Sequence, residues 1–273
     1  MNCIKDYTPT VLTIAGFDPY GGAGIQIDTK VIQALDVYAF SVSTALTAQS
    51  SIGVRDLQST DPKMFRLQLE TLLNDVKVDA VKIGMLANAE IIQVLVETID
   101  KYALKNIVLD TVLLSSSGKI LLEKDAIAYM MNELFSRVDL ITPNIPEVNT
   151  FLKSQYEGNY DEVKMISGSF FEKGVNAVLI KGGHSLDQDK ATDYLVSKTE
   201  GLITFSTSRI QTNHTRGTGC FLSSAIAALL AKGETLEKSV GSAKEFLTQR
   251  LEISSEIQFN YIDKNSIRKE PLL

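Results

Sequence analysis

Short runs of consecutive apolar residues alternate along the chain with longer segments in which apolar residues recur every three or four positions. Residues 10–15 (TVLTIA) are short and β-branched, as in a buried strand, and residues 25–35 follow with helical spacing. The same criteria predict strands at residues 38–46, 78–84, 106–110, 139–142 and 177–181. They predict helices after Asp61-Pro62, around Ile91, Leu95 and Ile99, and at residues 124–135, 161–172, 218–231 and 236–251. The chain therefore alternates strands with helices.

This alternation predicts a three-layer α/β/α fold with a mainly parallel central sheet that is covered by helices on both faces. Residues 194–197 and 203–206 are too close together to have a helix between them, so they predict a short antiparallel hairpin. We find no internal repeat or proline-rich linker, and we predict that residues 1–273 form a single domain.

The predicted strand ends carry unusual residues. In such a sheet, ligands bind beyond the carboxyl ends of the strands. Five ends are followed by GGAG at residues 21–24, Gly84-Met85, Asp110, Pro143-Asn144 and Lys181-Gly182-Gly183. We therefore expect the functional site at this edge.

Composition and net charge limit the classes of molecule that this protein is expected to bind. Apolar residues make up 44% of the 273 residues and charged residues 22%, which is ordinary for a globular protein. The net charge of −6 argues against nucleic acid and anionic membranes as partners, so an anionic ligand needs local donors. Cys3 and Cys220 lie far apart and show no disulfide or zinc spacing, and the first residues lack a signal-peptide pattern. These features predict a cytoplasmic protein.

The strongest motif is RGTGC at residues 216–220. Gly217 and Gly219 allow a tight turn that points backbone amides at one spot, and the start of the following helix adds partial positive charge, which together favour an anion. A thiol in the first turn of a helix, such as that of Cys220, has its thiolate favoured. The alternative is a pair of loop glycines followed by a small buried residue.

Two nucleotide-binding motifs are absent. The glycines at residues 21–24 do not have the GxGxxG spacing of a Rossmann fold, and Gly118-Lys119 is followed by Ile120 where a P-loop needs Ser or Thr. A Rossmann oxidoreductase and a P-loop ATPase are therefore disfavoured.

Three further residues suggest phosphate and metal chemistry. Asn144 and Glu147 are three apart where a strand gives way to a helix, so the two side chains could reach one hydrated Mg²⁺, form a capping box, or do both. Lys181 ends a buried strand, where it needs an anionic partner such as phosphate unless it snorkels to solvent.

Taken together, these segments resemble the ribokinase-like superfamily and, within it, the hydroxymethylpyrimidine and phosphomethylpyrimidine kinases of thiamine biosynthesis. The resemblance runs from Val11 to about Leu247. Its matching stretches are IAGFDPYGGAGIQID, TALTAQSSIGV, KIGML, VLDTVLLSSSGKILL, LITPNIPE, VLIKGGH and RGTGCFLSSAIAA.

The resemblance implies specific roles. The pocket for a hydroxymethylpyrimidine substrate would be lined by Gly16, Asp28, Gln49, Met85 and Val112, with Asp28 and Gln49 hydrogen-bonding the ring. Residues for ATP and Mg²⁺ would be Asp110, Asn144, Glu147, Lys181, Gly217, Thr218 and Gly219. Cys220 stands where sugar kinases of the superfamily carry an aspartate base. Family relatives usually form homodimers, so we expect one here.

Some positions depart from the family pattern and leave alternatives open. Phe17, Tyr20 and Arg216 replace smaller or different residues around the expected pocket, and Thr111 and Leu113 vary the segment after Asp110. A pyridoxine or pyridoxal kinase on the same fold is the nearest alternative, although Gln49 with Met85 favours the pyrimidine. A non-catalytic pyrimidine sensor is a further alternative, against which the complete phosphate-binding set argues.

Overall fold

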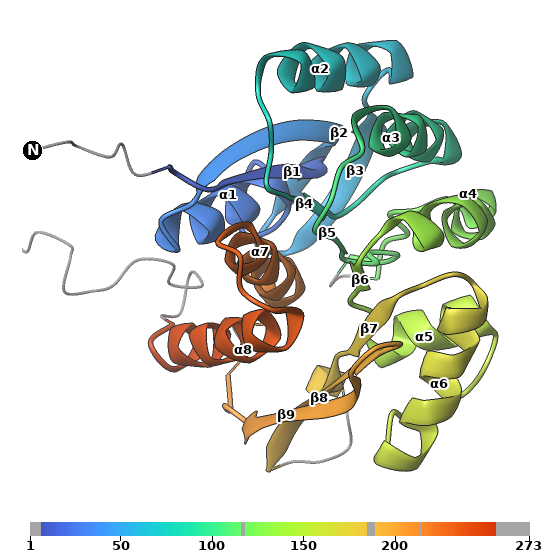
Figure 1. Cartoon of the computed structure of the whole chain (residues 1–273), viewed down its shortest axis with the longest axis vertical. Helices are drawn as coiled ribbons and strands as arrows, with labels where there is room; N and C mark the ends of the chain where they lie inside the picture. Colours follow the sequence, from blue (N-terminus) through green and yellow to red (C-terminus); the bar gives the residue numbers. More distant parts are fainter. Residues whose placement is uncertain (1–6, 116–117, 185–188, 213–214, 255–273) are drawn as a thin grey trace, which may run out of the picture.

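The computed structural model describes residues 7–115, 118–184, 189–212 and 215–254. Within these residues nine strands form one sheet in the order β3-β2-β1-β4-β5-β6-β7-β8-β9 (Figure 1). The strands are β1 (Thr10–Phe17), β2 (Tyr38–Ser50), β3 (Gly53–Ser59), β4 (Ala80–Ile83), β5 (Ile107–Leu109), β6 (Leu140–Ile141), β7 (Ala177–Ile180), β8 (Lys190–Ser197) and β9 (Gly201–Ser208).

The sheet is parallel in its centre and antiparallel at both ends. Strands β2, β1, β4, β5, β6 and β7 pair in parallel, whereas β3 is antiparallel to β2, and β8 and β9 are antiparallel to their neighbours. The predicted fold and the hairpin β8–β9 are confirmed. The sequence prediction missed β3, because this edge strand buries none of its side chains and so shows no alternation of apolar and polar residues.

Helices cover both faces of the sheet. Figure 1 shows α1, α7 and α8 on one face and α2 to α6 on the other. The helices are α1 (Gly24–Ala34), α2 (Pro62–Asp75), α3 (Ala89–Tyr102), α4 (Lys124–Tyr129), α5 (Ile145–Leu152), α6 (Tyr160–Glu172), α7 (Thr218–Ala231) and α8 (Leu236–Glu252). The helix predicted at residues 124–135 changes character, because α4 continues as a π-helical turn (Met130–Leu134) and a 3-10 turn (Phe135–Arg137).

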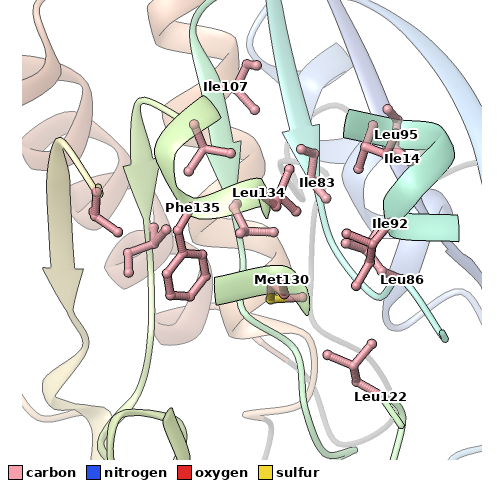
Figure 2. Close-up of a cluster of buried hydrophobic side chains, with 14 of the residues drawn as sticks. Ile14, Ile83, Leu86, Ile92, Leu95, Ile107, Leu122, Met130, Leu134 and Phe135 are labelled. Atoms are coloured by element: carbon pink, nitrogen blue, oxygen red, sulfur yellow. The ribbon is translucent and has the colours of Figure 1, made fainter. Parts of the chain in front are cut away.

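Each face has its own hydrophobic core. On the α2–α6 face, side chains of the central strands meet α3 and the segment that follows α4; Figure 2 shows Ile83 and Ile107 beside Ile92, Leu134 and Phe135. On the other face, residues 221–228 of α7 are all buried, as expected for a helix that is apolar nearly all round. Burial of one such large apolar side chain contributes about 1.5–3 kcal/mol, so the two cores hold the sheet rigid.

The parallel strands bring the unusual residues to one edge. Strands β1, β4, β5, β6 and β7 are consecutive parallel neighbours, so their carboxyl ends lie together. The segments that follow them are the five that the sequence singled out. Among the described residues, no helix is long and apolar enough to cross a membrane.

Candidate active site

A cavity of about 790 Å³ opens along this edge of the sheet. Ten of the predicted site residues line it: Gln49, Asp110, Val112, Asn144, Glu147, Lys181, Gly217, Thr218, Gly219 and Cys220. Gly16, Asp28 and Met85 are not among the lining residues. The cavity therefore brings the predicted phosphate and metal residues together, but only two of the five predicted substrate residues.

A buried ion pair lies in the wall of the cavity. The Nζ of Lys181, just after β7, lies 2.8 Å from Oδ1 of Asp110, just after β5, and the Thr142 hydroxyl donates to the same oxygen at 3.1 Å. Burial opposes the charge of Asp110, but the ammonium groups of Lys181 and Lys82 outweigh it and hold its pKa below the ordinary value. Burial likewise opposes the charge of Lys181, but Asp110 and Glu147 raise its pKa. Both groups of the pair are therefore charged at neutral pH.

The start of α7 faces this ion pair. A Cβ at Gly219 would lie 3.4 Å from both Lys181 Nζ and Asp110 Oδ2, so the first turn of the helix passes directly over the pair. Gly217 has φ +80°, and a Cβ there would collide with the carbonyl oxygen of Gly22. Glycine is thus required at Gly217 for both its conformation and its close approach.

Cys220 lies in the first turn of α7 and is half-buried. Burial raises the pKa of its thiol to about 11, although nearby Lys82 and a hydrogen bond from the Gly24 amide act in the opposite direction. The expectation that the thiolate is favoured is therefore wrong, because burial, together with the nearby carboxylates of Asp28 and Asp110, outweighs these two effects. The group is a neutral thiol at neutral pH.

Asn144 and Glu147 form the capping box of α5. Asn144 Oδ1 accepts from the Glu147 amide at 2.8 Å, and Glu147 Oε2 accepts from the Asn144 amide at 2.9 Å and from the Thr111 hydroxyl at 3.0 Å. Burial raises the pKa of Glu147 to about 7. In the described residues no hydrogen bond reaches its other oxygen, Oε1, and no group of three or more His, Cys, Asp or Glu side chains is arranged for a metal. The residues therefore fit a Mg²⁺ bound through water better than one in a protein cage.

Comparison with known proteins agrees with this geometry. The family model described as phosphomethylpyrimidine kinase matches residues 18–264. The chain belongs to the phosphomethylpyrimidine kinase family. It is 42% identical over 240 residues to a hydroxymethylpyrimidine/phosphomethylpyrimidine kinase of Escherichia coli (strain K12). The aligned residues cover 88% of this chain and 90% of that kinase.

Solved structures are similar throughout. The crystal structure of phosphomethylpyrimidine kinase from Clostridium difficile 630 has a TM-score of 0.77 and 37% identity, covering 89% of this chain and 99% of that one. The pyridoxal kinase of Bacillus subtilis, solved as an ADP complex, has a TM-score of 0.84 and 30% identity, covering 92% and 95%. Family and fold confirm the resemblance to ribokinase-like kinases, and the chain is a phosphotransferase.

Within this family scaffold, Asp28 does not reach the cavity. It is fully buried, and its carboxylate accepts from Lys82 at 2.8 and 2.9 Å, from Thr13 at 2.6 Å and from Ser224 at 2.8 Å. In this arrangement the Asp28 carboxylate is sealed among protein donors, and its implied hydrogen bond to a substrate ring stays a prediction. Lys82, which the sequence analysis did not single out, is the principal partner.

The other predicted substrate residues lie in two layers. The methyl group of Met85 fills the space that a Cβ at Gly16 would need, and both residues are buried beneath the cavity wall. Gln49 and Val112 line the cavity itself, and Gln49 Oε1 lies 3.4 Å from the Thr47 hydroxyl. Of the five predicted substrate residues, these two line the described cavity.

The glycine loop after β1 is held by an aspartate that the sequence analysis missed. The buried carboxylate of Asp18 accepts from the amides of Tyr20 at 2.9 Å, Gly22 at 3.1 Å and Ala23 at 2.9 Å. An Asp followed by Pro and Gly is a turn signal, and it could have identified this role. The loop is therefore rigid where it approaches Gly217.

Proposed function

We propose that this chain transfers the γ-phosphoryl group of ATP to 4-amino-5-hydroxymethyl-2-methylpyrimidine, and then to the resulting monophosphate, as a step of thiamine biosynthesis. One observation carries the proposal: the first turn of α7, the Lys181–Asp110 pair and the Cys220 thiol meet at one cavity. Its volume of about 790 Å³ is sufficient for a nucleotide and a small heterocycle together.

The phosphate-binding groups supply electrostatic stabilisation. Phosphoryl transfer passes through a loose transition state, so positioning and charge neutralisation matter more than a strong base. In the proposed mechanism the amides of residues 217–219 bind the γ-phosphoryl oxygens, and Lys181 binds the phosphate chain. A helix start alone contributes only about 0.3–2 kcal/mol to an anion, so both contributions are needed.

Cys220 orients the substrate hydroxyl through a hydrogen bond. Its thiol has a pKa of about 11, which keeps it neutral before the reaction and avoids repulsion between a thiolate and the incoming phosphates. Because bond formation to phosphorus lags behind bond cleavage, the hydroxyl proton is lost late and passes to an oxygen of the transferred phosphoryl group, so the thiol need not act as a base.

The carboxylates of Glu147 and Asp110 line the cavity and are suited to binding Mg²⁺. Asn144 holds Glu147 in place through the capping box. The ion would neutralise charge on the phosphates of ATP. The raised pKa of Glu147, about 7, implies that it becomes a full anion only when a cation or higher pH favours ionisation.

A pyridoxal kinase activity is the second candidate, because the Bacillus subtilis pyridoxal kinase has the same fold. The decisive experiment measures steady-state kcat/KM with Mg·ATP for the hydroxymethylpyrimidine and for pyridoxal. The proposal requires a preference for the pyrimidine. A preference for pyridoxal would refute the substrate assignment, and no ligand-dependent ATP consumption would point to a non-catalytic sensor.

We further infer a cytoplasmic homodimer that pairs through the β2–β3 hairpin. Ile52 at the tip of this hairpin is 92% exposed, and Leu46 on β2 and its register partner Phe17 on β1 are also exposed. Such apolar side chains favour a covered surface. The free Cys220 thiol suits a reducing compartment, whereas Cys3 lies outside the described residues. Light scattering on the purified chain and on an Ile52→Asp variant tests the dimer: a monomeric wild type would refute it.

A further inference from the structure

Arg216 stands at the wall of the cavity, immediately before the α7 turn, and bridges three segments. Its guanidinium lies over the Tyr20 ring at 5.3 Å from the centroid, its Nη1 donates to the Ser50 carbonyl, and its Nη2 lies 3.6 Å from Asp18 Oδ2. Its side chain is 21% exposed. A Cβ at Gly22 would lie 3.5 Å from its Nε, so the side chain runs along the glycine loop.

These contacts position the charge of Arg216 and pair it only loosely with a carboxylate. Arg216 forms an ion pair with the Asp18 carboxylate at 3.6 Å, which is longer than a hydrogen bond, and the hydrogen bonds to that carboxylate come from three backbone amides. A carbonyl and a ring face carry no net charge. Lys181 and Lys244, which also line the cavity, are instead bound to Asp110 at 2.8 Å and to Asp193 at 2.6 Å. The ion pair of Arg216 is therefore longer than those of Lys181 and Lys244, so its guanidinium can still donate to an incoming anion.

The contacts also place this charge on one side of the cavity. Ser50 follows Gln49, which lines the cavity at the β2–β3 turn, whereas Arg216 precedes the Gly217–Cys220 segment. A second cavity-lining arginine, Arg209, donates instead to the carbonyls of Gly183 and Lys190, next to β7 and β8. Arg216 thus lies between Gln49 and the phosphoryl-transfer end, where a substrate phosphate would be.

We propose that Arg216, braced by Tyr20, is a specificity residue that binds the phosphate of a phosphorylated substrate. The inference rests on the proposed function and concerns its second step. In that step a substrate phosphate oxygen forms a bond to the γ-phosphorus, the bond from that phosphorus to the bridging oxygen breaks, and ADP leaves with the electron pair. A guanidinium suits the substrate phosphate because its planar fork donates two parallel hydrogen bonds.

The test compares kcat/KM of wild type and Arg216→Gln for the hydroxymethyl alcohol and for its monophosphate. Loss of a charge-assisted pair should lower kcat/KM for the monophosphate by about 10- to 100-fold, mainly through KM. The value for the neutral alcohol should change by less than about threefold, because an uncharged group gains little from Arg216. Arg216→Lys keeps the charge but loses the fork, so it should fall between wild type and Arg216→Gln.

Two controls separate recognition from structural support. Tyr20→Leu removes the brace and should weaken monophosphate binding less than Arg216→Gln. Arg209→Gln removes a positive charge from the other side of the same cavity and should not alter the ratio of kcat/KM for the two substrates. Equal slowing of both substrates by Arg216→Gln would overturn the inference, because it would indicate that Arg216 only holds the α7 turn.

The outcomes also distinguish this inference from the proposed function. If wild type phosphorylates neither substrate, the proposed function is wrong. If it phosphorylates both and the ratio is unaffected in Arg216→Gln and Arg216→Lys, only the role of Arg216 is wrong. If Arg216→Gln does not fold, the Arg216→Lys variant is measured in its place. If its ratio of kcat/KM for the monophosphate to kcat/KM for the alcohol equals that of wild type, recognition by the guanidinium fork is overturned.

Discussion

Two lysine–aspartate pairs with the same 2.8 Å separation lie in the described core but differ in their access to the cavity. The Lys82 and Asp28 side chains are 0% exposed and do not line the cavity. Those of Lys181 and Asp110 are 13% and 3% exposed and do line it. Burial of a charged pair therefore does not by itself mark a ligand site; the opening to a cavity does.

The sealed pair connects structural elements. Asp28 of α1 accepts from Lys82 of β4, Thr13 of β1 and Ser224 of α7. Burial lowers the pKa of Lys82, but attraction to Asp28 outweighs this and the net shift is upward, so the ammonium stays charged. Ser224 is one turn after Cys220, so this network fixes the helix whose first turn forms the anion site.

The largest expected effect comes from breaking the sealed pair. Lys82→Met leaves the buried Asp28 without its cationic partner, with only the hydroxyls of Thr13 and Ser224 as donors, and should lower the free energy of unfolding by about 3–5 kcal/mol. Lys181→Met is the matched control: the same change at the open pair should cost less stability, because Asp110 can gain water from the cavity, but should abolish most turnover. Urea unfolding and kcat measurements on both variants check this.

A second variant sharpens that test. Lys82→Met combined with Asp28→Leu removes both charges and should recover much of the lost stability, because two apolar groups need no compensation. Equal losses of unfolding free energy in the two single variants would contradict the distinction between sealed and open pairs.

An intermediate effect is expected at Cys220. Cys220→Ala removes the group that orients the substrate hydroxyl and should lower kcat by about 10²-fold, the order of loss that misplacement of a reacting group causes, with little change in ATP binding. Cys220→Ser retains a hydroxyl that can orient the substrate and should be less impaired. Steady-state kinetics with varied ATP measure both quantities, and near-normal turnover in the alanine variant would exclude the proposed role.

The smallest effect is a pH dependence at Glu147. Its pKa is raised from 4.5 to about 7, so the native state binds the proton more tightly than the unfolded state. The free energy of unfolding should therefore fall as pH rises from about 4.5 to 7, by on the order of 2–3 kcal/mol from this group. Glu147→Gln can still accept the two hydrogen bonds and should show a flatter profile in urea unfolding between pH 5 and 8. Parallel profiles for the two proteins would assign the titration to another group.

The sequence predicted the parts of the molecule that depend on pattern. Residues 218–231 form α7 as predicted, because a helix that is apolar nearly all round can be stable only against the sheet. The position of the site also followed from the predicted topology, because the carboxyl ends of consecutive parallel strands lie at the same edge of the sheet. Strand β3 was missed because its side chains are not buried and its residues include the exposed pair Arg55 and Asp56.

The site was less predictable where side chains compete for partners. Asp28 and Lys82 are separated by 54 positions in the sequence, and nothing in the sequence indicates that they form an ion pair. The pKa of Cys220 depends on the balance between a helix start and burial, and only the packed structure fixes that balance. Likewise, the contact between Tyr20 and Arg216, two departures from the family pattern, becomes visible only when their loops are brought together.

The close approach of Gly217 to Gly22 has a mechanical consequence. The backbone of one turn rests on a carbonyl of the other with no space for even a methyl group, although nearly two hundred residues separate them. Closely packed segments transmit displacement instead of absorbing it. A shift of the turn before α7 when a triphosphate arrives is therefore passed to the loop after β1, so the two rims of the cleft respond as one body.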